Sequence, residues 1–180
     1  MTERINTDEI IFSNNDLSDA LYEEYKNSKY LAVDTEAMGL VHRRDRLCLV
    51  QICNEFKLTS CIKIDKGVYE ASNLKILFEN KNILKIFHFA RFDVAALKAN
   101  LTINTQNIFC TKIASKLART YTNKHGLKDL IYEMLGVELD KTSQSSDWGN
   151  QDNLSREQIN YAANDVRYLI DAMKKLNIIL

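Results

Sequence analysis

Two acidic residues close an apolar segment in the first quarter of the chain, which reads LAVDTEAMGL from Leu31 to Leu40. Alternate residues of a strand point to the same face, so Asp34 and Glu36 are expected to converge while Thr35 faces away. Two like charges this close need a cation or a shared proton, and a hard divalent ion bound through oxygen would satisfy them. In a chain with 24 acidic residues the pattern also arises by chance at a strand end.

A third acid, Asp93, lies in IFHFARFDVAAL, where an apolar strand is expected to run into an amphipathic helix. A carboxylate in the first turn of a helix is often there only because the helix dipole favours it. His88, just before this turn, fits either a site residue or a hydrogen-bonded structural histidine. The segment alone therefore leaves a catalytic and a structural interpretation open.

The last candidates, Tyr161 and Asp165, lie in QINYAANDVRYL, which has the pattern of a helix. A spacing of four residues places the phenol and the carboxylate on one face, and the small Ala162 and Ala163 allow close packing on a sheet. A phenol with an ordinary pKa of about 10 is a poor base at neutral pH. Tyr161 is therefore expected to orient a water molecule, although a solvated Asp beside a half-buried Tyr has the same spacing.

Together the three segments are more specific than any one of them. The four carboxylates of Asp34, Glu36, Asp93 and Asp165 could hold two divalent cations, Mg²⁺ or Mn²⁺, about 3.5 to 4 Å apart. Such a pair suits in-line phosphoryl displacement, because one ion activates the attacking water and the other neutralises the leaving oxygen. The hypothesis is a two-metal phosphodiester hydrolase.

The elements that would position these residues follow from composition and periodicity. Strands are predicted at 30–34, 47–53, 57–64 and 83–87, with an antiparallel hairpin through 54–56, and helices at 17–26, 73–80, 92–100, 112–120, 127–135 and 156–176, the last capped by Ser155. Antiparallel strands, then a strand–helix alternation, then mainly helices predict the α/β class. The expected architecture is a ribonuclease H-like mixed β-sheet flanked by α-helices.

Composition limits the broader class. With 180 residues, 46% of them hydrophobic, the chain is expected to form a single domain over 1–180. A membrane-span pattern and a signal-peptide pattern are both missing, and the four cysteines form no C-x-x-C pair, so we expect a cytoplasmic protein with reduced thiols. Net charge is zero, but residues 94–128 contain several basic and no acidic side chains, which predicts one locally positive face.

The ordered motifs resemble the DEDD exonucleases, in their ribonuclease D-like, tyrosine-containing branch. DTE, HFARFD and YAANDVRYL carry the resemblance, and CTKIASKLART, HGLKDL and LDKTSQSSDW look similar as well. The other branch has a histidine five residues before the last acid, where this chain has Asn160. The resemblance implies a 3′-5′ exonuclease whose catalytic residues are Asp34, Glu36, Asp93, Tyr161 and Asp165.

Within that branch, HRRDRLCLVQI and KIASKLARTYTNKHGLKDL look most like the nanoRNase C group of short bacterial enzymes. The resemblance implies release of 5′-mononucleotides from short RNA or single-stranded 3′ ends, and a homo-oligomer, either a dimer or a higher ring. No helical HRDC sequence follows Leu180, which favours small substrates. A broader exonuclease acting on single-stranded DNA and RNA is the alternative, and a non-catalytic nucleic-acid-binding module is disfavoured because all five side chains are present.

Substrate contacts are expected around the acids and on the basic segment. Leu40, Met38 and Phe89 could wedge against or stack on terminal bases, although each also suits core packing. The resemblance implies that Leu40 is the wedge, because members of this superfamily separate two terminal bases with a leucine after the first motif. Lys112, Lys116 and Arg119 follow one helix face that could meet phosphates or only solvent. Trp148 is expected to contact substrate, to brace a loop or to lie in the core. The full expected set is Thr35, Met38, Gly39, Leu40, His88, Phe89, Arg119, Lys124, His125 and Trp148.

Overall fold

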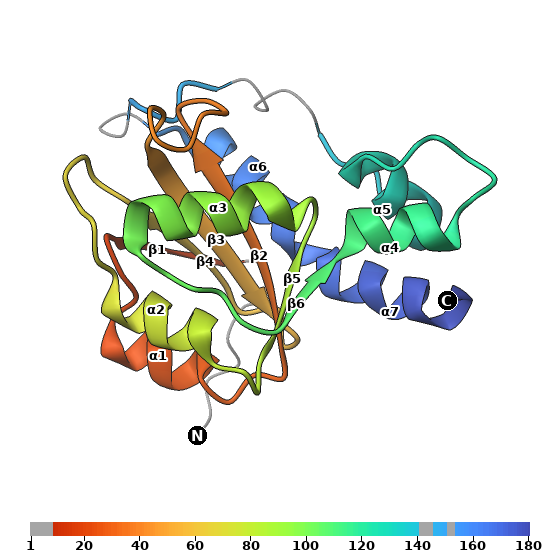
Figure 1. Cartoon of the computed structure of the whole chain (residues 1–180), viewed down its shortest axis with the longest axis horizontal. Coiled ribbons are helices and arrows are strands. Elements are labelled where there is room, and N and C mark those ends of the chain that lie inside the picture. Colours follow the sequence, from red (N-terminus) through yellow and green to blue (C-terminus); the bar gives the residue numbers. More distant parts are fainter. Residues whose placement is uncertain (1–8, 141–145, 151–153) are drawn as a thin grey trace.

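A six-stranded mixed sheet forms the centre of the molecule (Figure 1). The computed structural model describes residues 9–140, 146–150 and 154–180. The strands are β1 (Ile10–Asn14), β2 (Tyr30–Ala37), β3 (Leu47–Asn54), β4 (Thr59–Lys63), β5 (Leu84–Phe87) and β6 (Ile108–Cys110), in the order β1-β4-β3-β2-β5-β6. The strand β3 runs antiparallel to β2 and β4, whereas the β1–β4, β2–β5 and β5–β6 pairs are parallel.

Helices cover both faces of this sheet (Figure 1). The first face carries α1 (Asp19–Tyr25), α2 (Ser72–Glu79) and α3 (Ala90–Leu101), and the opposite face carries α6 (Arg156–Arg167) and α7 (Leu169–Ile179). Beside β6, α4 (Thr111–Ala118) and α5 (Leu127–Leu135) pack against α7. No helix within the described residues is long and apolar enough to cross a membrane.

The alternation of side chains along β2 decides which layer each site residue meets. Leu31 and Val33 pack into the core beneath α1, α2 and α3, whereas Ala32 packs with Val166 of α6 on the other face. Asp34 and Glu36 continue the register of Ala32, and Thr35 continues that of Leu31 and Val33. The two acids therefore face α6, and Thr35 faces α3.

The predicted strands and the hairpin between β3 and β4 are present, with ends shifted by a few residues. Two short edge strands, β1 and β6, were not predicted, because three to five residues carry little periodic signal. The predicted helix over 156–176 is wrong in one respect: it is broken at Tyr168, where the backbone has φ −107° and ψ −8°. The predicted cap at Ser155 is confirmed, and it forms a capping box with Gln158.

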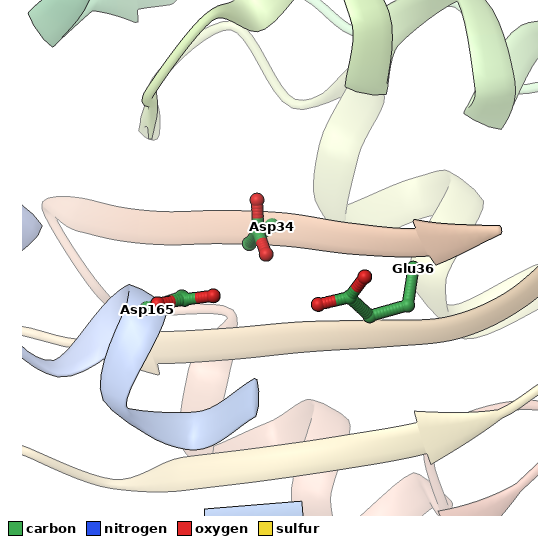
Figure 2. Close-up of side chains that lie close together, drawn as sticks. All are labelled: Asp34, Glu36 and Asp165. Atoms are coloured by element: carbon green, nitrogen blue, oxygen red, sulfur yellow. The ribbon is translucent and has the colours of Figure 1, made fainter. Parts of the chain in front are cut away.

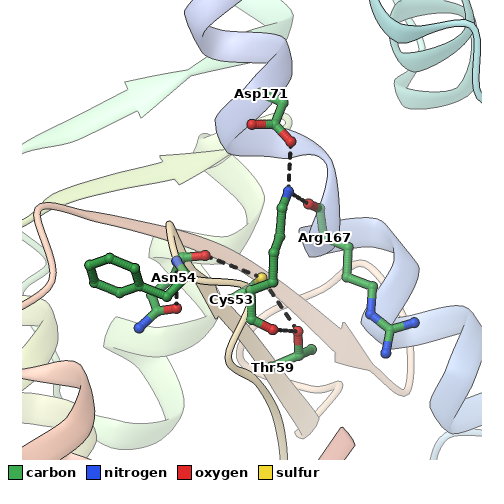
Figure 3. A network of polar contacts seen from close by, with 7 residues as sticks. Cys53, Asn54, Thr59, Arg167 and Asp171 are labelled. Atoms are coloured by element: carbon green, nitrogen blue, oxygen red, sulfur yellow. Dashed lines mark hydrogen bonds and ion pairs between the residues drawn. The ribbon is translucent and has the colours of Figure 1, made fainter. Parts of the chain in front are cut away.

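A lysine of the β3–β4 hairpin connects this helix break to the sheet, and its two partners, Arg167 and Asp171, are labelled in Figure 3. Lys57 Nζ donates to the carbonyl oxygen of Arg167 at 2.8 Å and pairs with Asp171 Oδ2 at 2.6 Å. The first partner is a carbonyl in the last turn of α6, and the second is an acid in the first turn of α7. The hairpin therefore holds the end of α6 two residues after Asp165.

Candidate active site

Three carboxylates from two elements meet between the sheet and α6. One carboxylate oxygen from each of Asp34, Glu36 and Asp165 lies within 4.8 Å of the other two. Asp34 and Glu36 project from the same face of β2, and Asp165 reaches them from α6 (Figure 2). The helix can approach because Ala162 and Ala163 are fully buried against the sheet. These three predicted residues are thus brought together, each partly accessible from one side.

The fourth predicted acid lies beside this group and outside it. Asp93, in the first turn of α3, is 2% exposed, and its Oδ1 accepts a hydrogen bond from Thr35 Oγ1 at 2.7 Å. Its charge still raises the pKa of both Asp34 and Glu36. Thr35 was predicted as a substrate contact, but its side chain is buried and its hydroxyl is used to hold Asp93.

Burial is the main cause of the raised pKa values of the carboxyl groups. It raises the pKa of Glu36 to about 8, with the charges of Asp165 and Asp93 adding to the effect and the Gln51 amide opposing it. Burial likewise raises the pKa of Asp93 and of Asp165 to about 7. The pKa of Asp34 is also raised, by burial first and then by the charges of Asp93, Asp165 and Glu36. Such mutual repulsion favours any ligand that brings positive charge.

Tyr161 lies at the edge of the acids, one turn before Asp165 on α6. Burial and the charges of Asp165, Glu36 and Asp34 raise the pKa of its phenol well above the ordinary value, so the hydroxyl keeps its proton. Tyr161 and Asp165 line a cavity of about 230 Å³ whose other wall is the start of α5, including Gly126 and Leu127. The site is thus open on the side that faces α5.

The family model described as 3′-5′ exonuclease matches residues 9–180. The chain belongs to this exonuclease family. Its curated relatives include ribonuclease D from Sphingobium indicum, 35% identical over 150 residues that cover 83% of this chain and 38% of that protein. DNA polymerase I from Aquifex aeolicus is 35% identical over 151 residues, which cover 84% of this chain and 24% of that protein. The chain thus spans at most about two fifths of the length of these curated relatives.

Solved structures agree with the family. Brucella melitensis NrnC bound to pGG is 44% identical, with a TM-score of 0.89, and the match covers 95% of this chain and 81% of that one. The same protein with bound Mg²⁺ is 43% identical, with a TM-score of 0.88. The predicted resemblance to ribonuclease D-like DEDD exonucleases and the predicted ribonuclease H-like fold are confirmed.

The donor set of this site fits a hard divalent cation. Carboxylate oxygens are the ligands that Mg²⁺ and Mn²⁺ prefer, and three of them lie within coordinating reach of one point. The raised pKa values of Glu36 and Asp165 indicate that the protein itself does not neutralise these charges. Together with the Mg²⁺-bound relative, the cluster supports the use of a divalent metal.

Three of the predicted base contacts are exposed apolar side chains close to the acids in the sequence. Leu40 is 80% exposed, Met38 60% and Phe89 48%. Phe89, the N-cap residue before α3, has φ +73°, an uncommon conformation for a bulky residue, and Lys112 Nζ lies 4.5 Å from its ring centroid. The structure explains why residue 39 is a glycine, because a side chain at Gly39 would overlap the carboxylate of Asp45. These positions leave Leu40, Met38 and Phe89 accessible to a ligand.

The histidine candidates are held by hydroxyl groups. Thr111 Oγ1 donates to the Phe87 carbonyl oxygen at 3.1 Å, so the 2.9 Å hydrogen bond between Thr111 and His88 is donated by His88 Nδ1. Burial and the nearby Lys112 lower the pKa of His88 to about 4, which keeps the ring neutral. His125 Nδ1 lies 2.9 Å from Ser115 Oγ, and Lys124 beside it is exposed.

Two predicted contacts are buried instead. The expectation that Arg119 continues a solvent-facing basic row is wrong, because its side chain is fully buried and forms an ion pair with Glu133. Its Nη1 also donates to the carbonyl of Lys124 at 2.9 Å, so it holds the loop that carries Lys124 and His125. Trp148 is 4% exposed and packs near Tyr161, which favours the core alternative over substrate contact. Residues 141–145 of the LDKTSQSSDW motif lie outside the described residues.

Sequence reasoning missed one residue of the site, Gln51. It is the cross-strand partner of Asp34 and is fully buried. The signal was available, because a single glutamine interrupts the apolar run LCLVQIC of β3. Its significance was hidden because only the sheet register places it opposite the acids.

Proposed function

We propose that this protein is a divalent-metal-dependent 3′-5′ exoribonuclease that releases 5′-mononucleotides from short RNA. The observation that carries the proposal is the convergence of Asp34, Glu36 and Asp165 within 4.8 Å in the fold of an exonuclease family. Similarity to ribonuclease D and to NrnC supports RNA as the substrate.

The chain's own residues would hold the reactants rather than react covalently. When bound, divalent ions supply a water that is easily deprotonated and positive charge for the leaving 3′ oxygen. Asp34, Glu36 and Asp165 would be the main ligands, with Asp93 as the fourth carboxylate beside them. Tyr161 keeps its proton, so its hydroxyl would orient the attacking water as a hydrogen-bond donor instead of acting as a base. We propose that the site binds two divalent ions, either Mg²⁺ or Mn²⁺.

A short substrate is favoured by the surroundings of the acids. Leu40 is exposed enough to wedge between two terminal bases, and Met38 and Phe89 are accessible for packing against them. Lys124 and His125, on the loop that Arg119 holds, would meet phosphate or sugar oxygens. The relative solved with pGG supports a ligand of this size.

The direct test removes one carboxylate. Asp34→Asn and Asp165→Asn should each abolish Mg²⁺- or Mn²⁺-dependent release of mononucleotides from a labelled dinucleotide while circular dichroism stays native, because the amide cannot replace the ligand charge. Glu24→Gln, an exposed acid on α1, is the matched control and should keep full turnover. Retained turnover in both site variants would contradict the metal-site proposal.

A DNA substrate is the second candidate, favoured by the 35% identity to a DNA polymerase I. The RNA and DNA candidates are distinguished by the rates at which the protein hydrolyses a 5′-phosphorylated diribonucleotide, an RNA heptamer and a matched DNA oligomer in one buffer. We expect the dinucleotide to be hydrolysed fastest. Equal rates on all three would refute the preference for short RNA.

Three further properties belong to the proposal. The chain is proposed to be one domain, supported by a single sheet that includes strands from residue 10 to residue 110. A cytoplasmic location is supported by the four cysteines, none of which forms a disulfide within the described part of the chain. A homo-oligomer is supported by exposed apolar side chains on one side of α4, Ile113 and Leu117, and sedimentation velocity would give its size.

A further inference from the structure

Gln51 occupies a position in β3 that couples it to the acids. In the antiparallel β2–β3 pair, Gln51 is directly opposite Asp34, and Glu36 pairs with Leu49 two residues away. Directly opposed residues of neighbouring strands point to the same face of a sheet. Leu49 and Cys53 confirm that face, because they pack in the clusters that contain α6 side chains. The Gln51 amide therefore lies on the side of the sheet that carries the carboxylates.

The amide is not held by other groups of the fold. Gln51 is 0% exposed, and neither its Oε1 nor its Nε2 has a partner in full hydrogen-bonding geometry among the described residues, although the amide is close enough to Glu36 to lower the pKa of that carboxyl group. Burial of an unpaired amide costs free energy that an apolar side chain of similar size would not cost. Every side chain of β3 from Leu47 to Cys53 except Gln51 is apolar. A leucine or methionine would fill this place at lower cost.

Asn54, three residues further along the same strand, shows the usual arrangement of a buried amide. Its Nδ2 donates to Ser28 Oγ at 3.2 Å, and its Oδ1 accepts from the backbone amides of Phe56 and Leu58, each at 3.1 Å. These bonds shape the β3–β4 hairpin. Gln51 has the same functional group and is equally buried, but its hydrogen-bonding capacity is unused and lies on the face of the sheet that carries the acids, close to Glu36.

We propose that Gln51 is a positioning residue for the divalent-metal site. Its Nε2 donates to the carboxylate of Glu36 when the acids are ionised around a cation, which fixes the direction of the ligand oxygen. Its Oε1 then accepts a hydrogen bond from a water of that site. Hydrogen bonds to ligating carboxylates orient them and strengthen metal binding. The inference rests on the proposed function, since it assigns Gln51 to the same site.

The role predicts effects in two directions that a purely structural glutamine would not produce. Gln51→Leu should raise the melting temperature of the metal-free protein, because the buried unpaired amide is gone. The same variant should bind Mn²⁺ about 10- to 100-fold more weakly by isothermal titration calorimetry. Turnover at saturating Mn²⁺ should fall as well. Gln51→Met, which keeps the length of the side chain, should behave in the same way.

Asn54→Leu is the matched control, since it makes the same change at a satisfied amide of the same strand. Its melting temperature should fall, and its Mn²⁺ affinity, measured well below that temperature, should stay within about twofold of wild type. Comparing the Gln51 variants with Asn54→Leu distinguishes the loss of a structural contact in β3 from the loss of a group that strengthens cation binding.

Metal affinity decides the outcome. Wild-type affinity in Gln51→Leu and Gln51→Met, or a loss no larger than that of Asn54→Leu, would overturn the role of Gln51 whatever the melting temperatures show. Failure of both variants to fold would overturn it too, because the fold would then need the amide. If wild-type protein shows no Mn²⁺-dependent hydrolysis at all, the proposed function itself fails, which is a separate result.

Discussion

At the scale of single residues, the site is a concentration of negative charge that the protein leaves uncompensated. Carboxylate oxygens of Asp34, Glu36 and Asp165 lie within 4.8 Å of one another, Asp93 is held nearby by Thr35, and no basic side chain pairs with any of the four among the described residues. Tyr161 is the neutral member. Its raised pKa leaves a phenol that donates a hydrogen bond at every physiological pH. The acids therefore supply the negative charge that binds a cation, whereas Tyr161 orients the attacking water.

Tyr161→Phe tests that assignment. We expect kcat on a short RNA to fall about 10²-fold, since a misoriented water loses the benefit of positioning, while Mn²⁺ affinity stays within about twofold. Stopped-time product assays and calorimetry measure the two quantities. Tyr132→Phe, at an exposed tyrosine on α5, is the control and should match wild type. An unchanged rate in Tyr161→Phe would mean that the phenol is only structural.

At the scale of elements, the approach of α6 to the sheet brings Asp165 to the acids of β2. Small buried alanines allow this approach, and the capping box of Ser155 and Gln158 starts the helix. At its other end, Lys57 of the β3–β4 hairpin holds the Arg167 carbonyl and Asp171 (Figure 3). The hairpin contact therefore stabilises the position of α6 along the sheet.

Lys57→Met should lower the free energy of unfolding by about 1 kcal/mol, the range expected for a half-exposed ion pair with one additional hydrogen bond. Urea denaturation of the metal-free protein measures it. Lys26→Met removes a surface pair with Glu23 within one helical segment and should change stability by less than about 0.5 kcal/mol. Equal effects of the two substitutions would show that the hairpin contact adds nothing to the helix break.

At the scale of the whole molecule, the acids link stability to pH and to metal. In the folded protein the pKa of Glu36 rises from 4.5 to about 8, and those of Asp93 and Asp165 rise from 3.8 to about 7. Between these limits the folded state binds more protons than the unfolded chain, so the stability of the metal-free protein falls as pH rises. Below about pH 4 these carboxyl groups are mostly protonated in both the folded and the unfolded state, so their ionisation no longer lowers the free energy of unfolding.

The melting temperature of metal-free protein should therefore decrease from about pH 5 to pH 8 more steeply in wild type than in Glu36→Gln. A divalent ion binds the ionised form and therefore binds more weakly at pH 5. One fixed MgCl₂ concentration, about 100 times the dissociation constant at pH 8, should raise the melting temperature by about 5 °C or more at pH 8 and by less at pH 5. Differential scanning calorimetry at both pH values checks this. An equal metal effect at the two pH values would contradict the linkage.

The sequence by itself determined the local geometry of the candidate site. The period of two along β2 puts Asp34 and Glu36 on one face, and the spacing of four puts Tyr161 and Asp165 on one side of α6, because both periods are properties of the backbone. The ordered motifs were enough to predict the family and the fold class. Strong apolar segments also predicted four of the strands.

Only the tertiary structure decided which distant groups meet. Sheet register placed Gln51 opposite Asp34, and layer packing put Thr35 against Asp93 instead of substrate. The burial of Arg119 and the break at Tyr168 were equally hidden, since a charged side chain and a helical pattern look the same in solvent and in the core. These outcomes depend on contacts between residues far apart in the chain, which periodicity does not record.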